Sequence, residues 1–234
     1  MTAPVLTLDG PSGSGKGTIG QAVAARLGWH YLDSGAVYRA LAYVLSERRI
    51  SDPQDPRVPR IARELDLECR PNLPGSAAIW VHGRDVSEPI RSEDCGRIAS
   101  KFAAEPAVRA ALLALQRRAR RSPGLVADGR DMGTVVFPDA PLKIFLTASP
   151  EVRAMRRYNQ LKVKGFDVNL ASLSEAIQAR DARDSKRVAS PLRPAGDAVV
   201  LDTSELLIEE TLSRVLSLIA TKLVVERADM TKTE

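Results

Sequence analysis

The sequence predicts an α/β fold in which helices flank a five-stranded parallel sheet. Five short apolar runs occur along the 234 residues, and stretches with helical spacing of apolar side chains lie between them. Strands that are apolar along their whole length are typical of parallel sheets, because both faces of such sheets are buried. A glycine-rich loop follows the first run and opens a helix, as expected for a doubly wound nucleotide-binding fold.

The alternation of strand and helix begins near the N-terminus. Residues 4–10 (PVLTLDG) form the first apolar run, and residues 18–28 (TIGQAVAARLG) follow with helical character. Gly28 is expected to end that helix, since glycine readily takes the left-handed conformation at a helix C-terminus. Residues 29–35 (WHYLDSG) predict the second strand and residues 36–49 the next helix.

The other three predicted strands lie in the C-terminal half, at residues 124–131, 142–150 and 197–204. Between residues 66 and 90 the alternation is interrupted by strand-like pieces that Pro, Asn and Gly divide. We expect a small antiparallel β insert at about residues 61–99, the alternative being an irregular surface loop. The whole chain, residues 1–234, is expected to form one domain.

The formal net charge of +5 fits either nucleic acid or small phosphorylated ligands as partners. The most basic run is LQRRARR at residues 115–121. On a helix its arginines spread over more than one face, which predicts a solvated helix end. Aromatic residues make up 4% of the chain and form no RNA-binding motif, so no nucleic-acid partner is expected.

The lack of a membrane helix or signal-peptide profile and the cysteine usage of the sequence predict a cytoplasmic protein. No run approaches the roughly 18 apolar residues of a membrane helix, and the N-terminus lacks the basic region of a signal peptide. We therefore expect no membrane partner. Cys69 and Cys95 have no metal-ligand spacing, so we expect them to be reduced thiols.

Residues 10–18 (GPSGSGKGT) fit the phosphate-loop pattern G-x-x-x-x-G-K-[ST] except at the last position, where Gly17 replaces Ser or Thr. Glycines let backbone N–H groups curl round an anion, and Lys16 can reach the terminal phosphates of a nucleoside triphosphate. Thr18 comes one residue late and can bond a phosphate from the first helical turn. The residues expected to bind ATP are Gly10, Pro11, Ser12, Gly13, Ser14, Gly15, Lys16, Gly17, Thr18 and, from the lid described below, Arg156.

The missing hydroxyl after Lys16 removes one direct magnesium ligand. We expect Mg²⁺ to be held by the phosphates of ATP and by waters, with no direct protein ligand. Asp128, at the end of the third predicted strand, is expected to orient a magnesium-bound water. A guanine-reading Asn-Lys-x-Asp segment is absent from the sequence, which argues against a GTPase.

Three clusters of alternating acidic and basic residues predict a second anion site opposite the loop, although each alone also fits a surface salt-bridge ladder. Two of the clusters follow predicted strands, where open α/β sheets bind ligands. The third lies on one face of a predicted helix. The clusters comprise Ser34, Gly35 and Arg39; Arg130 and Asp131; and Arg180, Asp184 and Arg187. Arginines suit a phosphate and carboxylates suit sugar or base donors, so a nucleoside monophosphate is the expected acceptor. An Asp–Arg pair matches the donor and acceptors of cytosine.

A basic stripe follows the fourth predicted strand. Arg153, Arg156 and Arg157 are spaced i, i+3, i+4, so they share one helix face. Phosphoryl transfer gains from cations near the moving group and from exclusion of water, which favours a short lid at about residues 153–167. The alternative is a solvated basic face.

The motifs GPSGSGKGT, LDSGAVYR, DGRDMGTVVFPDAPLKIFLTAS, RRYNQLKVKGF and RDARDSKR, in this order, resemble those of the bacterial cytidylate kinases over residues 1–220. The resemblance implies a P-loop kinase fold with strand order 2-3-1-4-5, a β insert on the monophosphate side and a short helical lid. It also implies transfer of the γ-phosphate of ATP, with Mg²⁺, to CMP or dCMP. A monomer is expected.

The resemblance also assigns roles to residues at matching positions. It implies that Ser100, Arg109 and Asp131 read cytosine and that Arg180 and Asp184 hold the sugar. The CMP phosphate would lie among the residues Ser34, Arg39, Arg130 and Arg187. The catalytic set would be Lys16, Asp128, Arg130, Arg153, Arg157 and Arg187. Two other functions stay open from the residues alone: a P-loop kinase for another small metabolite, and an ATPase stimulated by nucleic acid.

Overall fold

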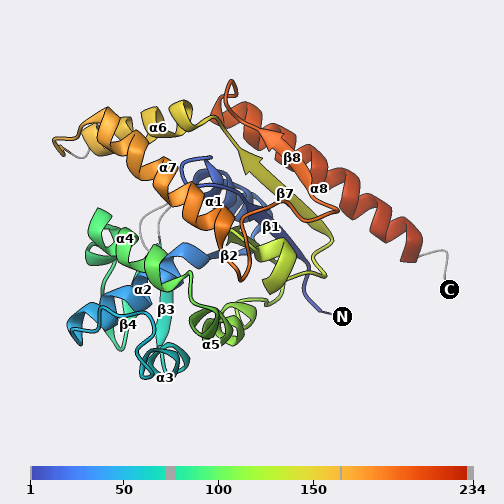
Figure 1. Cartoon of the computed structure of the whole chain (residues 1–234). Coiled ribbons are helices and arrows are strands. Elements are labelled where there is room, and N and C mark those ends of the chain that lie inside the picture. The colour runs from blue at the N-terminus through green and yellow to red at the C-terminus, as the bar shows by residue number, and fades with distance from the viewer. Residues whose placement is uncertain (1, 72–76, 164, 231–234) are drawn as a thin grey trace.

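A computed structural model describes residues 2–71, 77–163 and 165–230 (Figure 1). Its main sheet has five parallel strands in the order β2-β6-β1-β7-β8. These strands are β1 (Val5–Asp9), β2 (His30–Asp33), β6 (Leu125–Gly129), β7 (Leu142–Thr147) and β8 (Val199–Asp202). Counted along the chain, this is the order 2-3-1-4-5, so the predicted α/β fold is confirmed.

Helices cover both faces of the sheet. Successive residues of each strand point to opposite faces, and the apolar side chains on each face pack against helices. The helices are α1 (Lys16–Leu27), α2 (Ser34–Glu47), α3 (Val58–Arg63), α4 (Glu93–Phe102), α5 (Pro106–Arg117), α6 (Pro150–Val163), α7 (Leu170–Lys186) and α8 (Ile208–Met230), with short turns of helix at η1 (Pro89–Arg91) and η2 (Met132–Val136). Gly28 ends α1 in the left-handed conformation (φ 65°), as predicted.

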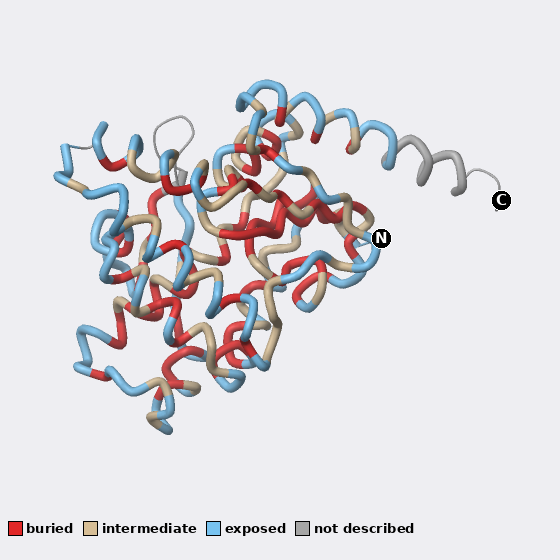
Figure 2. The backbone as a smooth tube through the Cα atoms, turned by 45° about the horizontal axis from the view of Figure 1, so that its top comes forward, coloured by how far each residue is buried: buried red, intermediate tan, exposed pale blue. Residues whose placement is uncertain are grey.

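The core consists of two apolar clusters, one on each face of the sheet. Val5 of β1 packs with residues of α2, α3, α4 and α5, whereas Leu6 and Leu8 pack with residues of α1 and α8. The buried strands therefore run through the centre of the molecule, with exposed helical faces around them (Figure 2). This arrangement leaves the carboxyl ends of the strands free to carry a site.

The predicted insert forms a separate antiparallel sheet in the order β3-β4-β5. Its strands are β3 (Leu67–Pro71), β4 (Ala77–Val81) and β5 (Arg84–Asp85), and residues 72–76 of the predicted insert lie outside the described residues. Ile79 and Val81 of β4 are buried in the cluster that also holds α2. The sheet packs against the core, so the alternative of an irregular loop is wrong.

The basic run at residues 115–121 is partly tied to the protein. Helix α5 ends at Arg117, whose Nε donates to the carbonyl oxygen of Val136 at 3.0 Å. Arg120 lies beyond the helix and donates to the carbonyl oxygen of Ala3 at 2.6 Å and to Asp139 at 2.5 Å. The expected solvated helix end therefore applies to Arg118 and Arg121, which are exposed. Within the described ranges, no helix combines the length and apolar character that crossing a membrane requires.

Candidate active site

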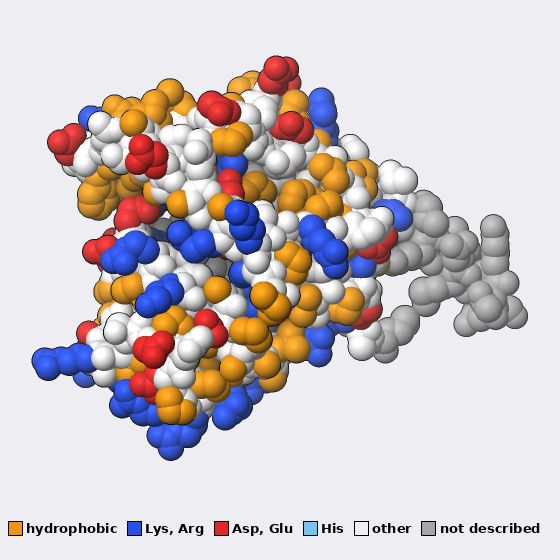
Figure 3. Space-filling model, viewed as in Figure 1, with side chains coloured by type: hydrophobic (Ala, Val, Ile, Leu, Met, Phe, Trp, Pro, Cys, Tyr) orange, Lys and Arg blue, Asp and Glu red, His pale blue; other side chains and the backbone are white. Residues whose placement is uncertain are grey.

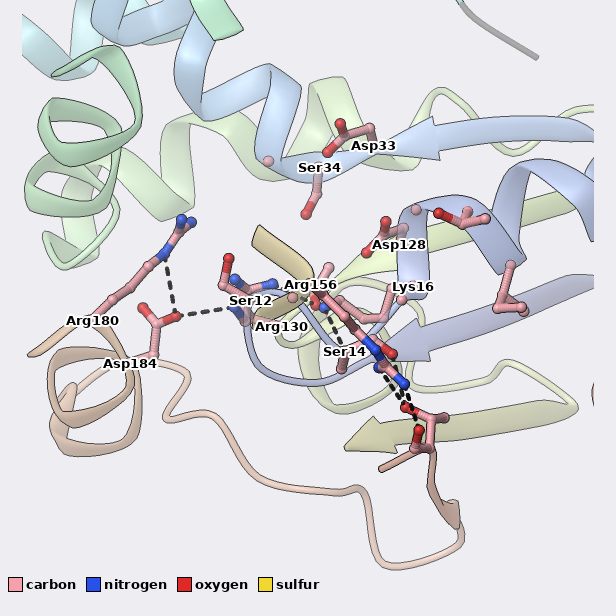
Figure 4. Close-up of a pocket in the computed structure, with 18 of the residues that line it drawn as sticks. Ser12, Ser14, Lys16, Asp33, Ser34, Asp128, Arg130, Arg156, Arg180 and Asp184 are labelled. Carbon is pink, nitrogen blue, oxygen red and sulfur yellow. Dashed lines mark hydrogen bonds and ion pairs between the residues drawn. The ribbon is translucent and has the colours of Figure 1, made fainter. Parts of the chain in front are cut away.

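A cavity of about 580 Å³ lies at the carboxyl edge of the parallel sheet. Its wall comes from the loop before α1, the starts of α2 and α8, helices α4 and α7, and residues 128–131. Basic side chains gather round this hollow, between the part of the molecule that carries α6 and α7 and the part that carries α4 (Figure 3). The cavity brings the predicted donor loop and the predicted acceptor clusters into one space (Figure 4).

The phosphate loop has a conformation that requires glycine. Gly10 has φ 146°, and a Cβ there would lie 1.9 Å from the carbonyl oxygen of Leu146 in β7. Gly15 has φ 92° and precedes the first residue of α1, so the helix N-terminus faces the cavity. Backbone N–H groups and the positive end of a helix are arranged here as anion binding requires.

Lys16 is 5% exposed and lines the cavity. Its Nζ donates to the carbonyl oxygen of Pro11 at 2.7 Å and to Ser14 Oγ at 3.3 Å. Burial, together with the charge of Arg130, lowers the pKa of Lys16 to about 7. The ammonium group thus lacks a full counter-charge until an anion enters, which suits a phosphate ligand.

Asp128 lies beside the position where the loop lacks a hydroxyl. A Cβ on Gly17 would lie 3.6 Å from Asp128 Oδ2, and Tyr31 Oη donates to the same oxygen at 2.9 Å. Burial raises the pKa of Asp128, while the positive charge of Lys16 opposes that rise. A carboxylate at this place faces the loop and supplies the hard oxygen that Mg²⁺ prefers.

The donor set fits a magnesium ion that arrives with the nucleotide. Among residues 2–71, 77–163 and 165–230, no group of three or more His, Cys, Asp and Glu side chains could enclose a metal ion. Mg²⁺ commonly keeps several waters and binds through one or two carboxylates plus substrate phosphates. Asp128, beside the phosphate loop, is a single carboxylate of the kind that could hold such an ion together with substrate phosphates.

Asp184 holds together the arginines of the predicted acceptor site. Its carboxylate lies 3.0 Å from Arg130, 3.5 Å from Arg187 and 4.0 Å from Arg180. Burial alone would raise the pKa of Asp184, but the three arginines lower it below its ordinary value. The spacing i, i+4, i+7 predicted that Arg180, Asp184 and Arg187 lie together; the first two are in α7, and Arg187 follows its last residue. Arg130, which follows β6, joins them by donating to Asp184.

Arg39 is held at the start of α2, where the cavity wall includes Ser34 and Gly35. Asp33 accepts a hydrogen bond from the backbone N–H of Ala36 at 2.9 Å, capping the helix, and also pairs with Arg39 at 3.0 Å. A Cβ on Gly35 would lie 3.3 Å from Arg39 Nη1. The small residue therefore lets the guanidinium fold back along the helix.

Ser100, Arg109 and Asp131 form a buried polar end of the cavity. Arg109 is ion-paired with Asp131, and its guanidinium lies 5.6 Å from the ring centre of Tyr38. Ser100 Oγ and Arg109 Nε are buried without a hydrogen-bond partner among the described residues. Unpaired buried polar atoms cost free energy, so this end of the cavity is suited to a ligand with several hydrogen-bonding groups.

The three arginines of α6 have different environments. Arg156 lines the cavity and donates to Thr203 Oγ1 at 3.0 Å. Arg153 is 3% exposed and lies outside the cavity wall, with its guanidinium on Asp181 at 2.6 Å and on the carbonyl oxygen of Ser12 at 3.2 Å. Arg157 is ion-paired with Glu93 of α4.

The stripe predicted on α6 is thus divided among the phosphate loop, the cavity and α4. The cause is that α6 packs against α7, which turns Arg153 inward toward Asp181. Its burial rules out a wholly solvated basic face. Residue 164 of the expected lid lies outside the described residues.

Sequence reasoning missed several residues around the cavity. Asp9 accepts hydrogen bonds from the backbone N–H groups of Met132 and Gly133, each at 2.8 Å, and burial raises its pKa to about 6. These bonds hold the segment after Asp131 in place. A polar residue at the end of an apolar strand was the available signal. The wall residues that the sequence did not predict are Ile19, Asp33, Tyr38, Ala99, Ala103, Gly129, Asn159, Gln160, Thr203, Leu206, Leu207, Ile208 and Thr211.

Comparison with known proteins gives one consistent result. The family model described as cytidylate kinase matches residues 6–221. A cytidylate kinase of Methylococcus capsulatus is 57% identical over 218 residues, which cover 93% of this chain and 97% of that protein. A cytidylate kinase of Pseudomonas putida is 55% identical over 219 residues, covering 93% and 96%. The matched region extends from β1 into α8 and so includes the whole cavity wall.

Proposed function

The chain belongs to the cytidylate kinase family, and from this premise we propose that it transfers the γ-phosphoryl group of ATP to CMP or dCMP, producing ADP and CDP or dCDP. The observation that carries the proposal is the presence of two anion sites in one cavity. The phosphate loop forms one, and the arginines around Asp184 form the other. The wall of the site comes from one chain, so the proposal is for a monomer.

ATP binds at the loop end in this proposal. Its phosphates accept hydrogen bonds from the backbone of residues 10–18 and from Lys16. The base lies toward Leu206, Leu207 and Ile208, where the wall is apolar, with Arg156 beside Thr203. When bound, Mg²⁺ would supply positive charge that offsets the charge of the ATP phosphates. Asp128 would help to hold the ion through its carboxylate.

CMP binds at the opposite end. Arg39, Arg130 and Arg187 neutralise its phosphate, because all three line the cavity that also contains Lys16. Ser100, Arg109 and Asp131 meet the polar edge of cytosine, where their unpaired buried atoms support such a role. Arg180 and Asp184 remain for the sugar hydroxyls.

The transfer needs no protein nucleophile. A phosphate oxygen of CMP attacks the γ-phosphorus of ATP, a new P–O bond forms, and the bond to the β–γ bridging oxygen breaks as ADP leaves. Lys16 and the arginines act by position and charge, since they offset the negative charge of the two substrates as these approach. Arg153 acts on this site through the loop, because it holds the carbonyl oxygen of Ser12.

An acceptor panel tests the proposal. We expect ADP release with ATP and Mg²⁺ to be fast with CMP and dCMP, and to stay close to the rate of ATP hydrolysis without acceptor when AMP, shikimate, gluconate or RNA is added. ³¹P NMR of the products identifies CDP directly. Equal or faster turnover with shikimate or gluconate would favour a metabolite kinase, and salt-sensitive stimulation by RNA would favour a nucleic-acid-dependent ATPase.

Binding of Mg·ATP is expected to take up protons at pH 8 and hardly any at pH 6. With a pKa of about 7 in the free chain, Lys16 is largely charged at pH 6 and largely neutral at pH 8. Phosphate oxygens raise that pKa, so the bound lysine is charged at both pH values, and uptake at pH 8 approaches about one proton. Calorimetry in buffers of different ionisation enthalpy measures it.

The matched control for this experiment is Lys16→Met, which has no group to titrate at this position. Its uptake at pH 8 is expected to be lower than that of the parent chain by most of a proton. Equal uptake at pH 6 and pH 8 in the parent chain would contradict the assignment of the proton to Lys16.

A further inference from the structure

The ring of Tyr31 packs against α1 at Gly20, and its hydroxyl lies near Gly17. It lies on β2, and a Cβ on Gly20 would lie 2.8 Å from its ring carbon Cε2. A Cβ on Gly17, one turn earlier on the same face of α1, would lie 3.8 Å from its hydroxyl oxygen. The absence of a side chain at Gly20 therefore lets the ring rest on the helix, and the hydroxyl then lies near Gly17 at the start of α1.

The hydroxyl of Tyr31 fixes one oxygen of Asp128. Its Oη donates to Asp128 Oδ2 at 2.9 Å. Burial, with the negative charges of Asp128 and Asp33, raises the pKa of Tyr31 above its ordinary value, so the phenol remains a donor. Within the described residues Asp128 Oδ1 has no hydrogen-bond partner. One oxygen is held and the other remains available.

The charged neighbours of Asp128 cannot hold it in one orientation by themselves. Lys16 attracts it but donates its hydrogen bonds to Pro11 and Ser14. Arg130 attracts it as well but donates its hydrogen bonds to Asp184 and to the carbonyl oxygen of Gly129. Asp33, the register partner of Asp128 on β2, repels it. A direct, short-range hydrogen bond from Tyr31 is the contact that selects an orientation beside Gly17.

We propose that Tyr31 is a positioning residue that holds Asp128 beside Gly17, so that its free oxygen is presented to the waters of the nucleotide-bound magnesium ion. This inference rests on the proposed role of Asp128. In this chain a tyrosine-held carboxylate serves in place of the Ser or Thr hydroxyl that follows the lysine in most phosphate loops.

Tyr31→Phe tests the proposal because it removes the hydroxyl and keeps the ring against Gly20. With ADP saturating, EPR of Mn²⁺ measures the metal affinity of the protein–ADP complex without turnover. We expect Tyr31→Phe to weaken Mn²⁺ binding by about three- to tenfold, the net contribution of one ordinary hydrogen bond. ADP affinity without metal should change by less than about twofold. Tyr43→Phe is the matched control, since Tyr43 packs on the core away from the cavity wall.

Asp128→Asn separates failure of this inference from failure of the proposed function. We expect Asp128→Asn to weaken Mn²⁺ binding at least as much as Tyr31→Phe, and the double variant to match Asp128→Asn alone. Unchanged Mn²⁺ affinity in Asp128→Asn would overturn the proposed role of Asp128. A normal affinity in Tyr31→Phe, or a further loss when it is added to Asp128→Asn, would overturn the positioning role of Tyr31 while leaving that of Asp128 intact.

Discussion

Replacing Lys16 by alanine is expected to lower kcat by about two to three orders of magnitude while the KM for CMP stays within about threefold. Lys16 Nζ is the buried cation at the loop end of the cavity, and the acceptor arginines lie at the other end. Its charge therefore opposes the charge that develops on the transferring phosphoryl group and does not contact CMP. Steady-state kinetics with varied CMP and saturating Mg·ATP measures both constants.

The same substitution is expected to leave the free energy of unfolding unchanged or slightly raised. Burial and the charge of Arg130 disfavour the charged form of Lys16, so the free chain gains little from keeping it. Lys222→Ala, which removes an exposed lysine of α8, is the control for both measurements and should change neither. A loss of kcat that parallels a loss of folding stability would show that Lys16 acts on the fold and not on the reaction.

Local sequence patterns were sufficient to predict the strands and helices, but not which strands lie next to each other in the sheet. Apolar runs such as residues 142–150 and the glycine at position 28 identified strands and a helix end, because burial and backbone conformation act locally. The pairing of β6 between β2 and β1 is not encoded in any one segment. The strand order was available only through resemblance to a family.

In the candidate site too, the sequence predicted which residues share a helix face but not which residues they contact. Helical spacing correctly placed Arg180, Asp184 and Arg187 on one face of α7. It placed Arg153, Arg156 and Arg157 on one face of α6 as well, yet spacing does not say what that face meets. Arg153 meets Asp181, Arg156 meets Thr203 and Arg157 meets Glu93.

The sequence does not show which side chain holds another residue in place. Tyr31 reads as an ordinary strand residue until its hydroxyl is found on Asp128, 97 positions away. Asp9 holds the backbone after Asp131 across a similar separation. Ser100 and Arg109 came from resemblance alone, since α4 and α5 approach the cavity only in the folded chain.

The paired charges make the acceptor end rigid before a ligand binds. Asp184 and Asp131 hold four arginines in place before the phosphate, sugar and base that those arginines are proposed to meet are bound. Fixed charges lose little freedom on binding and need little rearrangement during transfer. Two of these pairs, Arg109–Asp131 and Arg187–Asp184, are buried on both sides, so removal of one partner affects the fold as well as the substrate.

Asp131→Ala is expected to raise the KM for CMP by about 30- to 100-fold and to lower the free energy of unfolding by about 3 kcal/mol. Asp131 is 3% exposed and is the ion-pair partner of Arg109, which is itself buried. Its loss leaves an uncompensated guanidinium in the wall and removes an acceptor proposed to meet the amino group of cytosine. Initial rates at varied CMP and urea unfolding give the two quantities.

Two further variants separate the fold from base reading. Asp131→Asn keeps an oxygen acceptor of similar shape, so it should retain more CMP affinity than Asp131→Ala while Arg109 still loses its counter-charge. Glu64→Ala breaks an ion pair with Arg60 in which both side chains are exposed, and it should cost less than about 1 kcal/mol and leave the KM for CMP unchanged. If Asp131→Ala unfolds as easily as expected but binds CMP normally, Asp131 supports the wall and does not read the base. A rise in the KM for CMP supports a contact with cytosine, because a reduced folded fraction lowers the apparent kcat without altering the KM.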